Sequence, residues 1–179
     1  MLRFFILFIV ILIAVFAAEL TSPVQRAIVA PWTEALVRIS ANIITFFDPN
    51  VAVFGNILQS TTNGFAISIR AGCNGVEAAL ILIAAMLAFP TTWKHRVIGI
   101  LAGLIAVQFL NIIRVISLFY LGQWSINAFE WAHFYLWPAL IMLDVLIVWM
   151  IWIRSLPPGT PGVLNAASVD RIAPSVTAP

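Results

Sequence analysis

The chain has 179 residues, of which 63% are hydrophobic and only 9% are charged. Soluble domains carry about 25% charged residues, so this composition excludes a soluble globular domain and indicates an integral membrane protein. The formal net charge of +2 gives no basis for nucleic-acid binding, and the single cysteine, Cys73, excludes an intramolecular disulfide. The sequence has no CxxC pair, no phosphate-binding GxxxxGK[ST] loop and no GxSxG motif, and we expect no metal and no cofactor.

The first predicted element is an apolar segment over residues 2–20, with Arg3 at its start. Ala17 and Ala18 supply the small residues of a signal-peptide cleavage site, so a cleaved signal peptide is one interpretation. The apolar run is longer than that of a usual signal peptide, however, and we favour an uncleaved first transmembrane helix.

Residues 21–47 have an amphipathic pattern, because apolar residues recur at three- and four-residue steps with charged residues between them. This pattern predicts a helix that lies on the membrane surface or packs against the bundle, with a kink or division at Pro31. The predicted apolar face consists of Val24, Ile28, Trp32, Leu36, Ile39, Ile43 and Phe47.

Residues 48–72 change to short apolar runs around the turn signal Thr62-Asn63-Gly64. Such runs predict a small β-hairpin that leads directly to Cys73.

Three further apolar segments, over residues 76–89, 97–122 and 133–153, are predicted to span the membrane. The fold class is therefore an all-α membrane protein: a four-span transmembrane helical bundle with an outward amphipathic helix and a small β-hairpin. Residues 1–154 form the membrane-embedded domain. Residues 155–179 are rich in Pro, Gly, Ser and Ala, which predicts a disordered cytoplasmic tail.

The positive charges predict the orientation of these spans. Arg3, the Lys94-His95-Arg96 loop and Arg154 lie at alternate ends of the four segments, on one side of the membrane. By the positive-inside rule this side is cytoplasmic. The hairpin and the start of the second span then face outward.

This topology brings three reactive side chains to the outer leaflet. Cys73 lies at the outer end of the second span and His133 at that of the fourth, while Arg114 lies about 12 Å below the outer end of the third. A thiol can act as a nucleophile, an imidazole as acid and base, and a fixed guanidinium as an oxyanion partner. Separately, each also has an ordinary structural interpretation: a packed thiol, an ion-paired or snorkelling arginine, an interfacial histidine.

Three other polar residues in or next to the predicted spans also need an interpretation. Glu77 either orients His133 or binds Arg114, or it is a carboxylate at a helix start, where the helix dipole favours it. Asn74 either donates to an oxyanion or caps the helix, and capping is favoured. Asp144 is expected to hydrogen-bond with Gln108, Asn111 or Ser117, because a lone carboxylate at that depth needs a partner.

Three ordered motifs resemble the exosortase/archaeosortase family, most closely its small exosortase H type. They are the CNGVEA…LAFP stretch from Cys73, the NIIRV segment from Asn111 and the AHFYLWP segment from Ala132, within about residues 65–150. The resemblance implies a sortase-like site with Cys73 as nucleophile, Arg114 and His133 as its partners, and Asn111 in support. The chain lacks the extra spans of the longer exosortases.

The resemblance also implies the substrates: exported proteins with a C-terminal sorting signal made of a short motif, an apolar helix and a basic tail. For the exosortase H type this motif is IPTLxxWG. We therefore predict a cysteine transpeptidase or protease in the inner membrane, active at its outer face through a thioacyl intermediate, with membrane lipid around it. The alternatives are a non-catalytic membrane scaffold and a transporter subunit, and the absence of an inverted repeat disfavours transport.

Overall fold

The computed structural model describes residues 2–157, so most of the predicted tail over residues 155–179 lies outside the described residues. The described part is mostly helical, with one small antiparallel sheet. In chain order its elements are α1 (Leu2–Glu19), α2 (Ser22–Val24), the π-helical η1 (Gln25–Val29), α3 (Ala30–Thr45), β1 (Val51–Phe54), β2 (Ile57–Ser60), β3 (Ala66–Ser68), α4 (Val76–Ala88), α5 (Trp93–Trp124), α6 (Ile126–Trp131), the π-helical η2 (Ala132–Leu136) and α7 (Trp137–Arg154).

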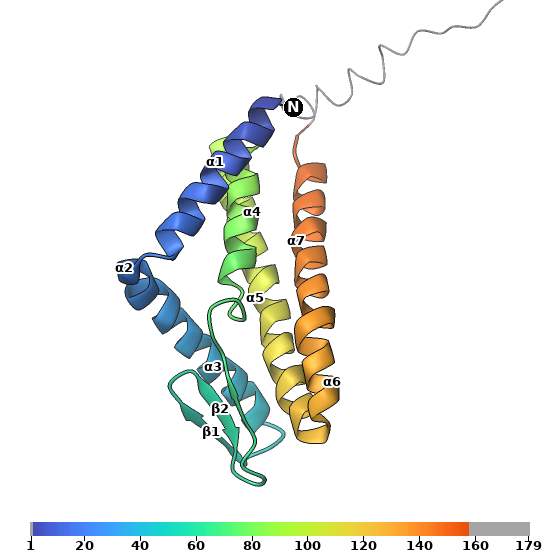
Figure 1. Cartoon of the computed structure of the whole chain (residues 1–179). Helices are drawn as coiled ribbons and strands as arrows, with labels where there is room; N and C mark the ends of the chain where they lie inside the picture. Colours follow the sequence, from blue (N-terminus) through green and yellow to red (C-terminus); the bar gives the residue numbers. More distant parts are fainter. Residues whose placement is uncertain (1, 158–179) are drawn as a thin grey trace, which may run out of the picture.

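Four helices form the bundle, in which α4 packs against α1, α5 and α7 (Figure 1). The α5 and α7 helices also pack against each other. The core between them contains Leu82 and Met86 of α4, Val107 of α5, and Ile141 and Val145 of α7. In Figure 1, α1 and α4 lie beside one half of α5, while α3 and the sheet lie beside the other half.

Four helical stretches in the described part are long and apolar enough to cross a membrane, namely Leu2–Glu19, Ser22–Thr45, Trp93–Trp124 and Ile126–Arg154. Four spans were also predicted, but one of the four differs. The stretch Ser22–Thr45 is among them, and the predicted span over residues 76–89 is not. The predicted second span over residues 76–89 is a helix of only 13 residues, α4. It is about 20 Å long, whereas a full span needs about 30 Å.

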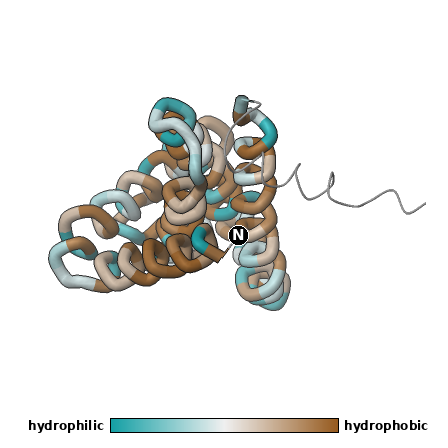
Figure 2. Tube along the Cα trace, turned by 90° about the horizontal axis from the view of Figure 1, so that it is seen from above, coloured by the Kyte–Doolittle hydropathy of each residue, from teal (hydrophilic) through white to brown (hydrophobic). Residues whose placement is uncertain are grey.

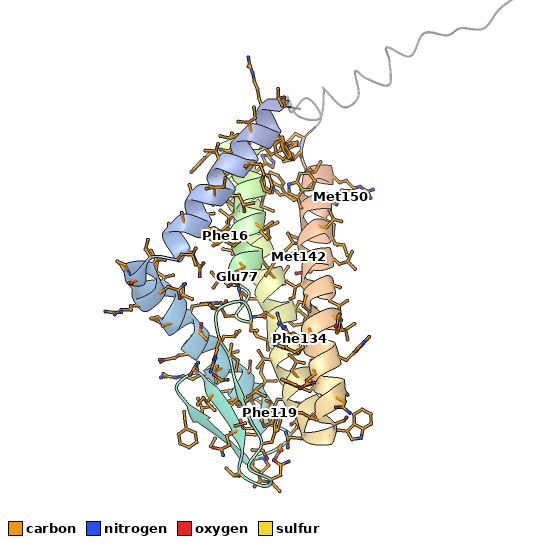
Figure 3. The ribbon with its side chains drawn as sticks, viewed as in Figure 1. Phe16, Glu77, Phe119, Phe134, Met142 and Met150 are labelled. Carbon is orange, nitrogen blue, oxygen red and sulfur yellow. The ribbon has the colours of Figure 1, made fainter. Side chains whose placement is uncertain are left out.

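The outer faces of the bundle are apolar, as expected for helices that contact lipid. Phe5 and Ile13 of α1 are 59% and 63% exposed, and Met142 of α7 is 55% exposed. Figure 2 shows hydrophobic residues along most of these helices, and Figure 3 shows the side chains of Met142 and Met150 on α7.

Residues 22–45 are helical throughout, and Pro31 does not break the helix. Instead, the backbone forms the π-helical turn η1 just before Pro31, and the N–H of Ala30 bonds to the carbonyl of Gln25. A proline has no N–H to donate, and a wider turn is one of the known ways in which a helix accommodates it.

Most of the predicted apolar face of this helix points away from the rest of the molecule, so it is not the face that packs against the bundle. Ile28, Trp32, Ile39 and Ile43 are exposed, whereas the buried residues of α3 are Thr33, Leu36, Val37, Ser40, Ala41 and Ile44. Only Leu36 belongs to both sets. The buried face contains small and hydroxyl side chains, which permit close approach to the sheet and α5, and the larger apolar side chains point outward.

The sheet has the order β1-β2-β3, and both neighbouring pairs are antiparallel. The predicted hairpin around Asn63 and Gly64 is confirmed as the β2–β3 connection, and a second hairpin turns at Gly55. Leu58 and Ile69 pack against Val37 of α3 and Phe119 of α5. Figure 3 shows Phe119 beside the sheet. The sheet is thereby fixed to the end of α5 that is remote from Trp93.

Candidate active site

The connection from β3 to α4 carries Cys73 and is anchored by Asn74. The Asn74 side chain is fully buried, and its Nδ2 donates to Oγ1 of Thr33 at 3.0 Å. Its Oδ1 accepts from the backbone N–H of Val76 at 3.1 Å. Asn74 therefore satisfies a free N–H at the start of α4, although the N-cap residue itself is Gly75, and it also joins α4 to α3.

Gly75 allows this connection to approach α5 closely. Its φ is +74°, in the left-handed region that favours glycine. A Cβ at this position would lie 3.0 Å from both Nδ2 of Asn111 and Nε2 of Gln108. The Gln108 amide donates to the Gly75 carbonyl at 3.4 Å, and Asn111 is fully buried beside it. Nδ2 of Asn111 donates to Oε1 of Gln108 at 3.5 Å, and no hydrogen bond among residues 2–157 links Asn111 to Cys73.

Glu77 holds the same connection from the other side. Its Oε1 accepts a hydrogen bond from the backbone N–H of Gly72. Figure 3 shows Glu77 at about mid-height of the molecule, at the start of α4. No hydrogen bond or ion pair links Glu77 to His133 or Arg114 within residues 2–157, so the structure favours its interpretation as a carboxylate at the helix start.

Cys73 lies between Arg114 and His133, as the topology predicts. Nη2 of Arg114 lies 3.5 Å from Sγ of Cys73, and Nε2 of His133 lies 3.9 Å from the same sulfur. Arg114 comes from α5 and is buried, with 6% of its surface exposed. Three separate elements thus place a cation and an imidazole at one thiol.

Phe129 positions the imidazole of His133, which belongs to η2. The two rings are stacked, with centroids 5.5 Å apart and planes 3° from parallel. Phe134 packs edge-on against the imidazole at 5.0 Å. Phe129 was not among the residues predicted for the site. It lies four residues before His133, a spacing that brings two side chains to one helix face, and this was the available signal.

The side chains of Cys73, Arg114 and His133 line a cavity of about 40 Å³. The other lining residues are Ile67, Ser68 and Ile69 of the β3 segment, Val115 and Leu118 of α5, and Phe129. This volume is close to that of one water molecule. The cavity therefore fits a small group at the thiol, such as a carbonyl, and not a whole side chain.

The predicted partners of Asp144 are wrong. Its Oδ2 is buried without a hydrogen-bond partner among the described residues. Gln108 and Asn111 instead face the start of α4, where Gln108 bonds to Gly75. Ser117 bonds to the carbonyl of Arg114 in its own helix. The error arose because depth was counted from the segment ends, which does not give the direction in which a side chain points.

A thiol beside an imidazole and a guanidinium has the components of nucleophilic catalysis at a carbonyl. Within residues 2–157, no group of three or more His, Cys, Asp or Glu residues is arranged to hold a metal ion.

Comparisons with known proteins give one positive result. The chain has no match among curated proteins or solved structures. A family model described as transmembrane exosortase (Exosortase_EpsH) matches residues 2–155. The match runs from α1 to the end of α7 and includes Cys73, Arg114 and His133. The chain therefore belongs to the transmembrane exosortase family.

Proposed function

We propose that this protein is a cysteine transpeptidase or protease that cleaves the C-terminal sorting signals of exported proteins within the membrane. Family membership suggests a membrane enzyme that processes sorting signals. The observation that carries the finer proposal is the position of Cys73 Sγ, 3.5 Å from Nη2 of Arg114 and 3.9 Å from Nε2 of His133.

The first half of the reaction forms a thioester. Nε2 of His133 takes the proton of the Cys73 thiol, and the sulfur attacks the scissile carbonyl carbon. The carbonyl oxygen becomes an oxyanion, which the buried Arg114 guanidinium stabilises. The carbon–nitrogen bond then breaks, and His133 returns its proton to the leaving amine of the apolar helix.

The second half releases the exported part of the substrate. An incoming amine, hydroxyl or water loses its proton to His133 and attacks the thioester carbonyl. The oxyanion forms again beside Arg114, and the carbon–sulfur bond breaks. His133 then returns its proton to the sulfur, which restores the thiol. A water acceptor gives hydrolysis, and any other acceptor gives transfer.

The proposal also includes the orientation of the helical bundle in the membrane. The positive charges of Arg3, Lys94, Arg96 and Arg154 favour a cytoplasmic position for the end of the bundle that carries them. Cys73 lies at the opposite end of α4 and then faces the exterior, where exported proteins arrive.

The test uses co-expression with an exported reporter that ends in an IPTLxxWG motif, an apolar helix and a basic tail. We expect the wild-type protein to shorten the reporter and the Cys73→Ala protein to leave it intact, because the chain has no second thiol. Membrane insertion of both proteins is verified by fractionation. Equal processing by the two proteins rejects the proposal and leaves a non-catalytic scaffold.

A second experiment measures the reactivity and accessibility of the Cys73 thiol by alkylation with a membrane-impermeant maleimide. Rapid labelling of wild-type protein from the outer face, slowed in Arg114→Gln, supports an activated outward thiol. Labelling only after membrane disruption contradicts the proposed orientation.

A further inference from the structure

The β3 strand has a free backbone edge beside the candidate active site. It pairs with β2 through Leu58 and Ile67, and no other strand pairs with it in residues 2–157. The N–H of Ile69 bonds to the carbonyl of Asn56, and the carbonyl of Phe65 accepts from Ser60.

The alternation of an antiparallel pair then determines which groups point away from the sheet. Phe65, Ile67 and Ile69 direct their backbone groups to β2. Ala66 and Ser68 direct theirs to the opposite side, and both residues are exposed. Their N–H and carbonyl groups are therefore open to an extended peptide.

This free edge is short, with three residues in β3, but it has no charge or proline that would oppose strand pairing. Natural edge strands commonly carry charged residues, prolines or bulges that prevent association. Residues 65–69 are Phe-Ala-Ile-Ser-Ile and contain no charge and no proline. An exposed sheet edge of this kind can bind an extended partner by β-augmentation.

The edge is continuous with the thiol site. Ile67 and Ser68 line the same cavity as Cys73, together with Phe129 and His133. Since that cavity is only about 40 Å³, a substrate backbone cannot enter it whole. A peptide extended along β3 would stay outside the cavity and present one carbonyl to the sulfur.

We propose that the substrate segment next to the scissile bond binds in extended conformation along the free edge of β3, with hydrogen bonds to the backbone of Ala66 and Ser68. This inference rests on the proposed function for the identity of the occupant. The main-chain bonds supply affinity, and the apolar wall formed by Leu118 and Phe129 contacts side chains that point inward.

The first arm of the test removes one edge donor. Ser68→Pro deletes an N–H that points away from β2, so the sheet keeps its own hydrogen bonds, and proline is compatible with edge positions of this kind. We expect reporter processing at least ten-fold slower than wild type. Ser68→Ala removes the hydroxyl but retains the N–H, so slowing in Ser68→Pro beyond that in Ser68→Ala measures the loss of this donor. Alkylation of Cys73 at an unchanged rate verifies that Ser68→Pro keeps the site intact.

The second arm measures binding without catalysis. In the Cys73→Ala background, Ser68→Cys is combined with reporters that carry single cysteines at successive positions around the cleavage site. We expect disulfide cross-links to this edge. Phe54→Cys is the matched control, because Phe54 is 60% exposed on β1, the opposite edge strand. We expect it to cross-link little.

The two arms separate the two proposals. Wild-type processing that persists in Ser68→Pro, with equal cross-linking from both edges, overturns the docking inference and leaves the transpeptidase proposal standing. Specific cross-linking at position 68 without any wild-type processing supports docking and rejects the proposed chemistry. Cross-links between two copies of the chain through position 68, in place of reporter cross-links, overturn the inference and assign the edge to self-association.

Discussion

Arg114 is the residue on which the electrostatics of the candidate site depend. It is 6% exposed, and its Nη2 contacts the Cys73 sulfur. A lysine at this position supplies a point charge and lacks the planar fork of a guanidinium. We therefore expect Arg114→Lys to lose most reporter processing while Arg70→Lys, at an exposed position outside the cavity, retains it. Wild-type activity in Arg114→Lys would show that charge alone suffices.

His133 has a separate role that its own variant tests. Loss of a general acid and base typically costs on the order of 10² or more in rate. We expect His133→Ala to reduce the rate of reporter cleavage by about that factor. The matched control is His95→Ala, because His95 lies in the first turn of α5, remote from Cys73, and bonds to Thr92. Equal effects of the two substitutions would exclude a specific role for His133.

Gly75 is expected to be intolerant of any side chain. Gly75 and Gly64 both have a φ of +74°, so an alanine at either site takes an unfavourable backbone conformation, at about 1–2 kcal/mol. Only at Gly75 does the added Cβ meet neighbours, the amides of Gln108 and Asn111. Thermal unfolding in detergent should show a larger loss for Gly75→Ala than for Gly64→Ala. Equal losses would mean that α4 shifts freely on α5.

At the scale of elements, the buried bond between Thr33 and Asn74 joins α3 to the start of α4. Thr33→Val keeps the shape of the side chain and leaves Nδ2 of Asn74 without this acceptor, at a cost of about 1–3 kcal/mol. Ser40→Ala is the matched control on the same helix, because Ser40 Oγ is buried without a hydrogen-bond partner among the described residues. Thermal unfolding should separate the two variants, and equal midpoints would contradict a structural role for the bond.

Elements with strong periodic or turn signals could be predicted from the sequence. The long apolar runs gave α1, α5 and α7, and Thr62-Asn63-Gly64 gave the β2–β3 hairpin. The buried face of α3 could not be predicted in the same way, because in a membrane protein large apolar residues are stable on the outer surface as well as inside. Hydrophobicity therefore does not decide which face is the core.

The candidate site was predictable to a similar extent. Counting residues along the spans placed Cys73, Arg114 and His133 at one end of the bundle, and the structure brings them together. Contacts that depend on rotation about a helix axis were not predictable. Gln108 and Asn111 face Gly75 and not Asp144, and Phe129 stacks on His133.

At the scale of the whole molecule, the length of α5 places the site relative to the bilayer. The helix has 32 residues, and Arg114 lies about 32 Å from Trp93 along its axis. The hydrocarbon core is about 30 Å thick. With Trp93 at the cytoplasmic interface, Arg114 lies at the outer interface and the rest of α5 extends outside to hold the sheet. The depth of 12 Å expected from the sequence assumed that α5 ends at the membrane surface.

This placement predicts the topology of the chain. At Thr62, between β2 and β3, a fused reporter should be active if it is of a kind that works only outside the cytoplasm, and inactive if it works only in the cytoplasm. Fusions at Thr92 and after Arg154 should be active only as cytoplasmic reporters, because the basic residues flank these positions. A cytoplasmic Thr62 would place Cys73 away from exported substrates and contradict the proposed function.

The central claim is that Cys73 forms a thioester with the exported part of the substrate. The most direct measurement adds hydroxylamine to purified protein and reporter and determines the new C-terminus of the cleaved reporter by mass spectrometry. Hydroxylamine attacks thioesters, so we predict a C-terminal hydroxamate that increases with hydroxylamine concentration and is absent with Cys73→Ala. A cleaved reporter that ends only in a free carboxylate at every hydroxylamine concentration, or equal cleavage by Cys73→Ala, would contradict the claim.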